Sequence, residues 1–348
     1  MTQEAVLEVR PDRAEAFAAS VFSAIGSPRG EAALIASELV RAERMGLRSH
    51  GLMRLTEYVR AAKSGTAIPG AEIRVEETGP ATLLVHGGRN FGQVVGARAA
   101  DAVARQASVM GSSTAVIRES HHVGRLGALV ERLALEGLVG IAMATVRPLG
   151  HFMVPWGGSE GRLGTNPLAY AVPTTGDPIL ADFATSVVPE GVVRLARDRG
   201  DRLVPGAIVD ARGQPTDDPG ALYTEPRGGL LPFGGPVGHK GYALAVLAEL
   251  LAGTLGGYRA DDESRPSNGV WLHAVDPAAF MDAFEFRRLA SGLRDYLKSS
   301  PPAPGVSRVL VPGEREYEQL GRPGLIVDSD TAKRLGVLAD ELGVPRVA

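Results

Sequence analysis

The feature that most constrains the fold is a regular alternation of short and long apolar segments between residues 72 and 145. The short segments are rich in β-branched and aliphatic residues, whereas apolar residues in the long ones recur at helical spacing. This predicts strands at 72–76, 81–85, 113–118 and 138–145, and helices at 93–107 and 125–136. Such an alternation is typical of an α/β domain whose helices cover a sheet.

The segments on either side extend the prediction over the rest of the chain. The first seventy residues read as helices that end at glycines, over 11–25, 28–46 and 49–63. Beyond residue 145 we expect strands at 168–172, 178–183, 269–275 and 308–311, and helices from residue 189 and over 241–255, 277–298 and 331–342. Residues 201–240 are expected to be largely loop. The change of pattern places a domain boundary near residue 75.

Composition limits the classes of partner and compartment. The 348 residues include 37 Lys and Arg and 40 Asp and Glu, a formal net charge of -3, with no basic stripe. Nucleic acid and anionic membrane surfaces are therefore not expected as partners. Cysteine is absent, the start of the chain lacks the features of a signal peptide, and no run of ~20 apolar residues occurs. These observations predict a cytoplasmic location.

One predicted helix face combines an acid–base group, a fixed cation and a phenol. His50, Arg54 and Tyr58 recur every four residues, so on a helix their side chains point the same way. Ser49 is the expected N-cap of this helix. The three groups can converge on one small anionic molecule, although a capped surface helix with a solvated arginine explains the pattern equally well.

Two adjacent histidines, His121 and His122, stand between a predicted strand and a predicted helix, beside Gly124. Side chains at such junctions face a cleft, and the helix N-terminus attracts anions. The pair therefore favours a functional role over a structural one. The histidines at 50, 121, 122 and 239 show no helical His-x-x-x-His spacing, so no metal site is expected.

Three further stretches have the chemistry of a phosphate or ribose site. Gly238-His239-Lys240-Gly241 combines glycines, helix-start amides and a point charge, while 164–167 and 182–186 place hydroxyl and amide groups after strands. Each signal is weak alone, because ordinary turns have the same composition. The chain has no G-x-G-x-x-G after a strand, no Walker loop, no H-E-x-x-H and no G-x-S-x-G, which disfavours an ordinary Rossmann domain, a P-loop enzyme, a zincin and an α/β-hydrolase.

Taken together and in order, the motifs resemble those of the type 2 malate/L-lactate dehydrogenase family. This family includes ureidoglycolate, sulfolactate and 2,3-diketogulonate dehydrogenases and a piperideine-2-carboxylate reductase. The resemblance spans nearly the whole chain, and the ordered set is far more specific than any one motif. The motifs are Ser49-His50-Gly51 with Arg54-Leu55 and Tyr58, Ser120-His121-His122-Val123-Gly124, Pro155-Trp156-Gly157-Gly158, Gly164-Thr165-Asn166-Pro167-Leu168, Asp182-Phe183-Ala184-Thr185-Ser186-Val187-Val188, Leu231-Pro232-Phe233-Gly234-Gly235, His239-Lys240-Gly241-Tyr242 and Val311-Pro312-Gly313-Glu314-Arg315-Glu316.

The resemblance implies a fold of the sulfolactate dehydrogenase type, with an α/β, non-Rossmann NAD(P)-binding domain that contains a mixed sheet. A helical substrate domain would be built from residues 1–75 joined by the C-terminal segment 305–348, and the NAD(P)-binding domain from residues 76–304. The resemblance also implies NAD or NADP as cofactor and a small anionic substrate. A homodimer with its active site in an interdomain cleft is implied as well.

Carried over residue by residue, the resemblance implies catalytic roles for His50, His122 and Arg54. It places Ser49 and Tyr58 at the substrate, with His121 beside them. The residues implied as cofactor contacts are Thr165, Asp182, Ala184, Thr185, Ser186, His239, Lys240, Gly313 and Glu314.

The chain also departs from the family pattern at three places. The family usually has Asn where this chain has His121, and Lys where it has Val192. Residues 144–154 look longer than the common form and add His151. These positions lie near the expected pocket, so they bear on the identity of the substrate more than on the reaction class.

We therefore expect reversible hydride transfer between nicotinamide and C2 of a small 2-oxo or 2-hydroxy acid. Arg54 would hold the carboxylate by a two-pronged contact, and either His50 or His122 would exchange a proton with the substrate oxygen. Two alternatives stay open: reduction of a cyclic imine carboxylate, and a catalytically idle protein that binds a nucleotide or a small acid. Without a Rossmann acidic residue to read, the sequence does not distinguish NAD from NADP.

Overall fold

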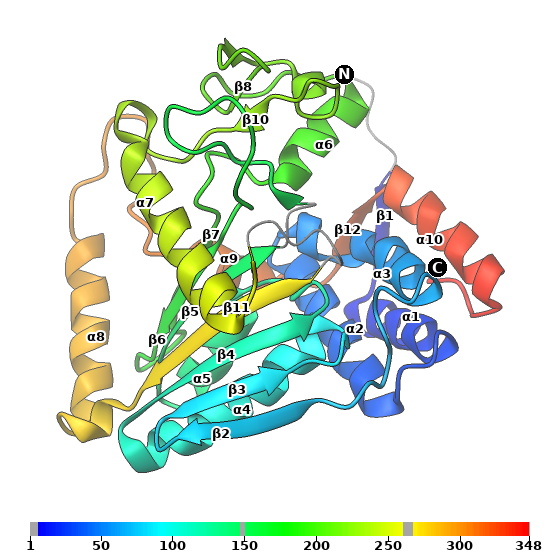
Figure 1. The fold of residues 1–348 in the computed structure, drawn as a ribbon. Helices are drawn as coiled ribbons and strands as arrows, with labels where there is room; N and C mark the ends of the chain where they lie inside the picture. Colours follow the sequence, from blue (N-terminus) through cyan, green and yellow to red (C-terminus); the bar gives the residue numbers. More distant parts are fainter. Residues whose placement is uncertain (1–5, 147–149, 260–266, 348) are drawn as a thin grey trace.

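The computed structural model describes residues 6–146, 150–259 and 267–347, and a seven-stranded sheet runs through its centre (Figure 1). In spatial order the strands are β2 (Arg74–Gly79), β3 (Thr82–His86), β4 (Ser112–Ser120), β11 (Asn268–Val275), β5 (Val139–Val146), β6 (Leu168–Val172) and β7 (Ile179–Phe183). Strands β3 and β4 run parallel, and the other neighbours run antiparallel. The predicted α/β fold with a mixed sheet is confirmed.

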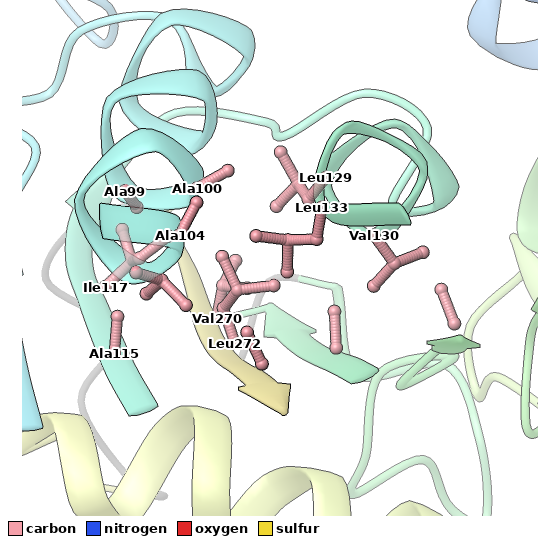
Figure 2. Packing of buried hydrophobic residues seen from close by; sticks show 14 of the residues in the cluster. Ala99, Ala100, Ala104, Ala115, Ile117, Leu129, Val130, Leu133, Val270 and Leu272 are labelled. Atoms are coloured by element: carbon pink, nitrogen blue, oxygen red, sulfur yellow. The ribbon is translucent and has the colours of Figure 1, made fainter. Parts of the chain in front are cut away.

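Helices cover both faces of this sheet. They are α4 (Gly92–Met110) and α5 (Gly127–Leu135) on one face and α7 (His239–Ala248) on the other (Figure 1). Figure 2 shows the first interface, where Leu133 of α5 packs over Ile117 and Leu272, all three fully buried. Alternate residues of strands such as β3, β6 and β11 reach the interior, which is why these strands were visible in the sequence as short apolar runs, whereas the edge strand β2 has no buried residue.

A second core lies in a helical layer beside the sheet. Its elements are α1 (Pro11–Ala24), α2 (Arg29–Arg44), α3 (Leu55–Lys63), α10 (Ser329–Leu342) and the antiparallel pair β1 (Val6–Val9) and β12 (Leu325–Asp328). Phe22, Leu39 and Tyr58 fill the centre of this core. The first and last described segments of the chain therefore meet here, as Figure 1 shows in blue and red. The sequence analysis missed β1 and β12, because four-residue strands that pair across the whole chain leave no local pattern.

The predicted helix over 49–63 is wrong in its first third. Two 3-10 turns, Arg48–His50 and Leu52–Arg54, precede α3, which begins only at Leu55. Gly51 has φ -94° and ψ -148°, outside the helical region, and the N–H of Leu52, which follows it, donates to Glu43 Oε2 at 2.9 Å. Ser49 therefore caps no helix, and His50 does not share an α-helical face with Arg54 and Tyr58.

Three other predicted elements need correction. The region 277–298 divides into a 3-10 turn, Pro277–Ala279, and α8 (Ala283–Lys298), because Asp282 caps α8 by accepting the Glu285 N–H. No strand forms at 308–311, and α9 (Glu314–Leu320) follows instead. The helix expected over 241–255 begins at His239 as α7 and changes into a π turn at Glu249–Gly253.

A third, smaller core surrounds α6 (Glu190–Arg199) and a three-stranded sheet of β10 (Gly229–Leu230), β8 (Ile208–Val209) and β9 (Pro215–Thr216). The start of α6 approaches the helical layer, since a Cβ on Gly191 would lie 3.6 Å from Ser49 Cβ. The structure thus brings α6 to the turns that carry His50 and Arg54. None of the described helices has the length and apolar character needed to cross a membrane.

One buried carboxylate, Glu131 on α5, joins the layers. Its oxygens lie 2.5 Å from Arg41 Nη2 of α2 and 2.5 Å from Arg125 Nη2, and they accept a hydrogen bond from Tyr317 of α9 at 2.9 Å. The side chains of Glu131 and Arg125 are 4% and 3% exposed. These bonds hold the pKa of Glu131 below its usual value against the opposing effect of burial.

We expect Glu131→Gln to lower the free energy of unfolding by about 3–5 kcal/mol, because it leaves two arginine charges without their shared carboxylate. Urea denaturation followed by circular dichroism measures the change. Glu160→Gln is the control, since Glu160 pairs with Arg162 on the surface, where ion pairs contribute little. Equal stability of the Glu131 variant and the wild type would contradict the expectation.

Candidate active site

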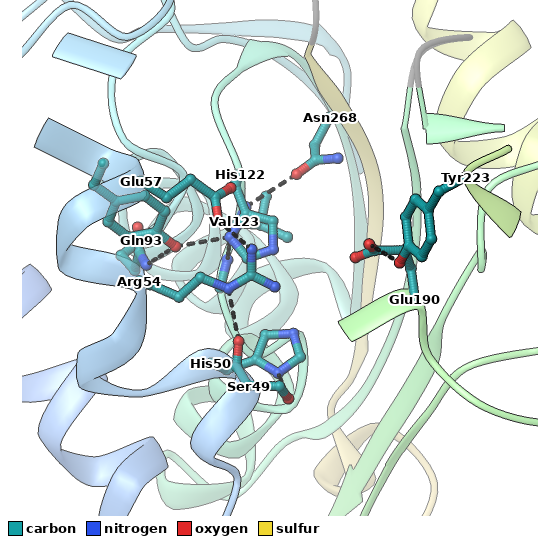
Figure 3. Close-up of polar contacts among 12 residues, drawn as sticks. Ser49, His50, Arg54, Glu57, Gln93, His122, Val123, Glu190, Tyr223 and Asn268 are labelled. Carbon is teal, nitrogen blue, oxygen red and sulfur yellow. Dashed lines mark hydrogen bonds and ion pairs between the residues drawn. The ribbon is translucent and has the colours of Figure 1, made fainter. Parts of the chain in front are cut away.

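Side chains from four elements meet where the helical layer faces the end of β4 (Figure 3). The Tyr58 hydroxyl of α3 lies 2.7 Å from Nδ1 of His122, and Gln93 Nε2 of α4 donates to the Tyr58 oxygen at 2.9 Å. The rings of His50 and His122 stack with centroids 5.8 Å apart. The predicted convergence of these side chains is therefore present in the structure, although it comes from turns and a loop and not from one helix face.

The hydrogen bonds determine which nitrogen of His122 carries its proton. The backbone N–H of Gly124 donates to His122 Nδ1 at 3.3 Å, and because an N–H only donates, Nδ1 is an acceptor. The Tyr58 oxygen already accepts from Gln93, so its own proton points to the same Nδ1. Neutral His122 therefore carries its proton on Nε2.

His50 has no such restriction. Its Nδ1 lies 3.0 Å from the Ser49 hydroxyl, and a hydroxyl either donates or accepts. His50 can thus adopt either neutral tautomer. The two histidines are chemically different even though their rings are parallel neighbours.

Arg54 is held in place by its own turn. Its Nε donates to the Ser49 carbonyl at 2.6 Å, and Nη1 pairs with Glu57 Oε2 at 2.6 Å. Within the described part of the chain, Nη2 has no hydrogen-bond partner. A side-on, two-pronged contact through Nε is not available in this arrangement, so a carboxylate would meet Arg54 through the Nη atoms.

Burial and nearby arginines keep all three histidines neutral. Burial, with the charges of Arg54 and Arg125, lowers the pKa of His50 to about 4. Burial and Arg54 likewise lower the pKa of His122 well below its usual value, and burial lowers that of His121 to about 4. An anion bound beside Arg54 would offset these positive charges and make a proton on His50 less costly.

His121 lies on the other side of Tyr58. Its ring meets Tyr58 and Phe91 edge-on, with centroids 5.6 and 5.8 Å away. Its Nδ1 is buried and has no hydrogen-bond partner among the residues that the structure describes. The structure therefore packs His121 against the aromatic rings beneath the site, and its role as a substrate contact stays a prediction.

Figure 3 shows Glu190 and Tyr223 across from this cluster. The Tyr223 hydroxyl donates to Glu190 Oε1 at 2.7 Å, and the guanidinium of Arg197 lies 4.3 Å from the Tyr223 ring centroid. The sequence analysis missed Glu57, Gln93, Glu190 and Tyr223. The spacing of three from Arg54 was a signal for Glu57, whereas no local pattern links Glu190 to Tyr223.

The residues predicted to contact the cofactor form two groups. One lies in the loop 184–186 and the first turn of α7, and the other comprises Asp182, Gly313 and Glu314. Thr185 donates its hydroxyl to the carbonyls of Thr165 and Asn166, and its own carbonyl accepts the Phe233 N–H, which ties this loop to the segment before α7. The hydroxyl of Ser186 donates to the Val188 carbonyl. The backbone N–H of Thr185 also donates to the Thr165 carbonyl, so these residues hold the loop that contains Ala184 in shape through bonds within the protein.

His239 and Lys240 lie exposed in the first turn of α7, and Trp156 packs edge-on against His239. Lys240 makes no ion pair within the described ranges. A free cation beside unpaired helix-start amides fits a phosphate group, so the residues present suit NAD(P) here.

Asp182 lies on β7, and Gly313 and Glu314 lie at the start of α9, where Gly313 contacts the same strand. Asp182 accepts the Gly127 N–H at 2.7 Å at the start of α5. Gly313 has φ 88° and packs on Leu180, where a Cβ would lie 2.9 Å from the carbonyl oxygen, and Glu314 pairs with Lys298. The structure thus does not bring these three residues to the His239–Lys240 turn.

Three further features named in the sequence analysis are a metal site, the segment 144–154 and Val192. No group of three His, Cys, Asp or Glu side chains suited to a metal ion occurs among residues 6–146, 150–259 and 267–347. Of the long segment 144–154, residues 147–149 lie outside the described residues. Val192, where the family usually has Lys, is exposed on α6.

Comparison with known proteins identifies the family. The profile for malate/L-lactate dehydrogenase matches residues 9–335. The chain is 33% identical over 354 aligned positions to malate dehydrogenase of Pyrococcus horikoshii, covering 98% of this chain and 97% of that one. It is 37% identical over 325 positions to (2R)-3-sulfolactate dehydrogenase (NADP(+)) of Chromohalobacter salexigens, covering 90% and 94%.

Among solved structures, delta1-piperideine-2-carboxylate reductase from Pseudomonas syringae pvar. tomato superposes with a TM-score of 0.84 at 31% identity, covering 96% of this chain and 100% of that one. The fold, the ordered motifs and these similarities agree. The chain therefore belongs to the malate/L-lactate dehydrogenase family and is an NAD(P)-dependent oxidoreductase that acts on the CH–OH groups of hydroxy acids.

Proposed function

We propose that the site built from His50, Arg54 and His122 transfers a hydride reversibly between nicotinamide and C2 of a small 2-hydroxy or 2-oxo acid. The observation that carries this proposal is the pairing of two unlike neutral histidines, stacked 5.8 Å apart beside a buried arginine. An anion-binding cation, a hydrogen-bond donor and a proton acceptor are what such a reaction requires of a protein. The names of the malate and sulfolactate dehydrogenases similar to this chain support the substrate class.

The two histidines have different roles in this proposal. His122 presents Nε2–H, which donates a hydrogen bond to the substrate oxygen, and moving its proton to Nδ1 would break the bonds from Tyr58 and Gly124. His50 keeps a free choice of tautomer, so it takes the hydroxyl proton when the hydride leaves C2. In reduction His50 returns that proton to the oxygen.

The bound nicotinamide supplies or accepts the hydride, and the protein supplies position and charge. Arg54 holds the carboxylate through its Nη atoms, while Ser49 and Glu57 fix the guanidinium. We propose that the α7 turn with His239 and Lys240 holds a cofactor phosphate. Whether Thr165, Asp182, Ala184, Thr185, Ser186, Gly313 and Glu314 contact the cofactor stays a prediction.

The division into domains belongs to the same proposal. Residues 1–75 with 305–348 would form the substrate domain that carries His50 and Arg54, and residues 76–304 would carry His122 and the cofactor. The separate helical core, which contains residues from both ends of the chain, supports this division. The cytoplasmic location also stays a prediction.

We expect turnover of NADH or NADPH with at least one acid from a panel of pyruvate, oxaloacetate, 3-sulfopyruvate and a cyclic imine carboxylate. Arg54→Lys should raise KM for an oxo acid about 10–100-fold, because charge-assisted bonds to a carboxylate contribute about 1.5–3 kcal/mol. Arg60→Lys, an exposed change on the neighbouring helix α3, is the control. Turnover of the imine alone would favour the reductase alternative, and cofactor binding without any turnover would favour the idle alternative.

His50→Asn should lower kcat about 100–10,000-fold, as expected for loss of the proton-transfer group. The pH profile separates its role from that of His122. In the wild type, kcat/KM for oxidation should fall only as the pH approaches 4, where free His50 becomes protonated and can no longer accept a proton. His122→Asn should keep this inflection, whereas His50→Asn should lose it. An inflection that disappears in the His122 variant alone would reverse the two roles.

The homodimer is proposed because α8 lies at the edge of the molecule and exposes large apolar side chains (Figure 1). Phe284, Leu293 and Tyr296 on this helix are 62%, 54% and 75% exposed, and only Ser291 of α8 is buried. Apolar patches of this kind are typical of interfaces between protein chains.

Sedimentation equilibrium should give twice the chain mass of 36.4 kDa, and Tyr296→Asp should shift the protein towards the monomer. Val109→Asp, an equally exposed change on α4, is the matched control and should leave the mass unchanged. A wild-type protein with the mass of one chain would contradict the proposal.

A further inference from the structure

A small internal cavity lies behind His50, between α2, α4 and the start of α5. It is lined by the polar side chains of Glu38, His50, Gln93 and Arg125, with Leu39 and Leu129 among its apolar walls. The space open to the centre of a water-sized sphere is ≈ 20 Å³. About 10–15 Å³ measured in this way holds one water molecule, so the cavity has room for ordered water.

Four polar atoms around this cavity lack a partner among the described residues. Two are acceptors, Glu38 Oε2 and Gln93 Oε1, and two are donors, Arg125 Nε and Nη1. Gln93 and Arg125 are each only 5% exposed. Buried polar atoms are nearly always hydrogen-bonded, and water is the small molecule that donates and accepts at once.

The charges around the cavity also favour water over an anion. The positive charge of Arg125 is already balanced by Glu131, which lies 2.5 Å from its Nη2. The unpaired oxygens of Glu38 and Gln93 would repel an anion, whereas a water molecule can donate to both.

The cavity connects the supports of both catalytic histidines. Gln93 faces it with Oε1, and its Nε2 donates to Tyr58, which in turn donates to His122. His50 lines the cavity directly. Glu38 on α2, which no step described above uses, lines the same cavity.

We propose that ordered water in this cavity carries protons between His50 and the carboxyl group of Glu38. The inference rests on the proposed function, because it requires His50 to be the group that takes the substrate proton. After a hydroxy acid is oxidised, protonated His50 gives its proton to the water, and the water gives one of its own to the Glu38 carboxylate. His50 is then neutral, the water is unchanged and Glu38 releases the proton to solvent. In reduction each step runs in reverse.

The groups around Glu38 suit such an exchange. Burial raises the pKa of Glu38, and Glu131 raises it further, whereas Arg125, Arg41 and Arg132 lower it. These opposing effects leave the carboxyl group able to hold and release a proton at a higher pH than an exposed glutamate. Arg132 lines the cavity and is 42% exposed, so the route from Glu38 to solvent is short.

The test is Glu38→Gln, which keeps the shape of the side chain and removes its acidic proton. In oxidation the first turnover starts from neutral His50, so its rate should match the wild type, while later turnovers slow and kcat falls about tenfold or more. KM and the Kd for NAD(P)H should not change, and a small buffer base such as neutral imidazole, which can accept the proton from His50 in place of Glu38, should restore kcat. Glu15→Gln, an exposed change on α1, should behave as the wild type.

A variant with wild-type kcat at every pH would overturn the proposal. So would an equal loss in the first and later turnovers, because that pattern indicates a structural defect. A high-resolution crystal structure should show water bonded to Gln93 Oε1 and Arg125 Nη1, and a dry cavity would also overturn it. Failure of the wild type to turn over any acid or imine would instead contradict the proposed function itself.

Discussion

The arrangement of the whole molecule depends on how one buried carboxylate, Glu131, is satisfied. Its partners come from three parts of the chain: Arg41 from the helical layer, Arg125 from the segment that follows His122, and Tyr317 from the C-terminal region. A charge this far from water must be surrounded by partners, so the three parts meet at fixed positions. The turn that carries His50 and the loop that carries His122 are thereby held against each other.

The chemistry of the site follows from the same exclusion of water. Histidines near Arg54 and Arg125 lose their protons because a second positive charge is costly in a buried place. The hydrogen bonds of each neutral histidine then determine which tautomers it can adopt. A backbone N–H makes Nδ1 of His122 an acceptor and so places the proton on Nε2, while the Ser49 hydroxyl leaves His50 free to adopt either tautomer. Two residues of one type thus become chemically different because of their neighbours.

The side of the site formed by α6 carries a departure from the family pattern. Val192 stands in place of the usual lysine, and Glu190, held by Tyr223, faces Arg54 from this side. These groups make the cleft less positive than Arg54 and the family's lysine together would make it. The change is compatible with the family's reaction, since Arg54 and both histidines are present. We expect it to affect recognition of the end of the substrate that lies away from the carboxylate.

Much of the architecture was predictable because its causes are local. The alternating segments between residues 72 and 145 became strands and helices within a few residues of the expected positions, since each pattern reflects burial of one face. The family, and with it the reaction class, also followed from short motifs such as Ser49-His50-Gly51. The errors occurred where distant contacts override local preference. Gly51, packed against Glu43, leaves the helical region and interrupts the expected 49–63 helix, and β1 forms only because β12 comes to lie beside it.

The sequence by itself determined the α/β class, the family and a set of candidate site residues, because these depend on periodicity and on residue type. Only the tertiary structure decided which contacts each of those candidates makes. The direction of the bond between Gly124 and His122, the contacts that occupy Arg54, and the shared cavity of Glu38 and His50 all involve groups that meet after folding. A hydrogen bond needs a partner at a definite distance and direction, and no spacing along the chain supplies that information.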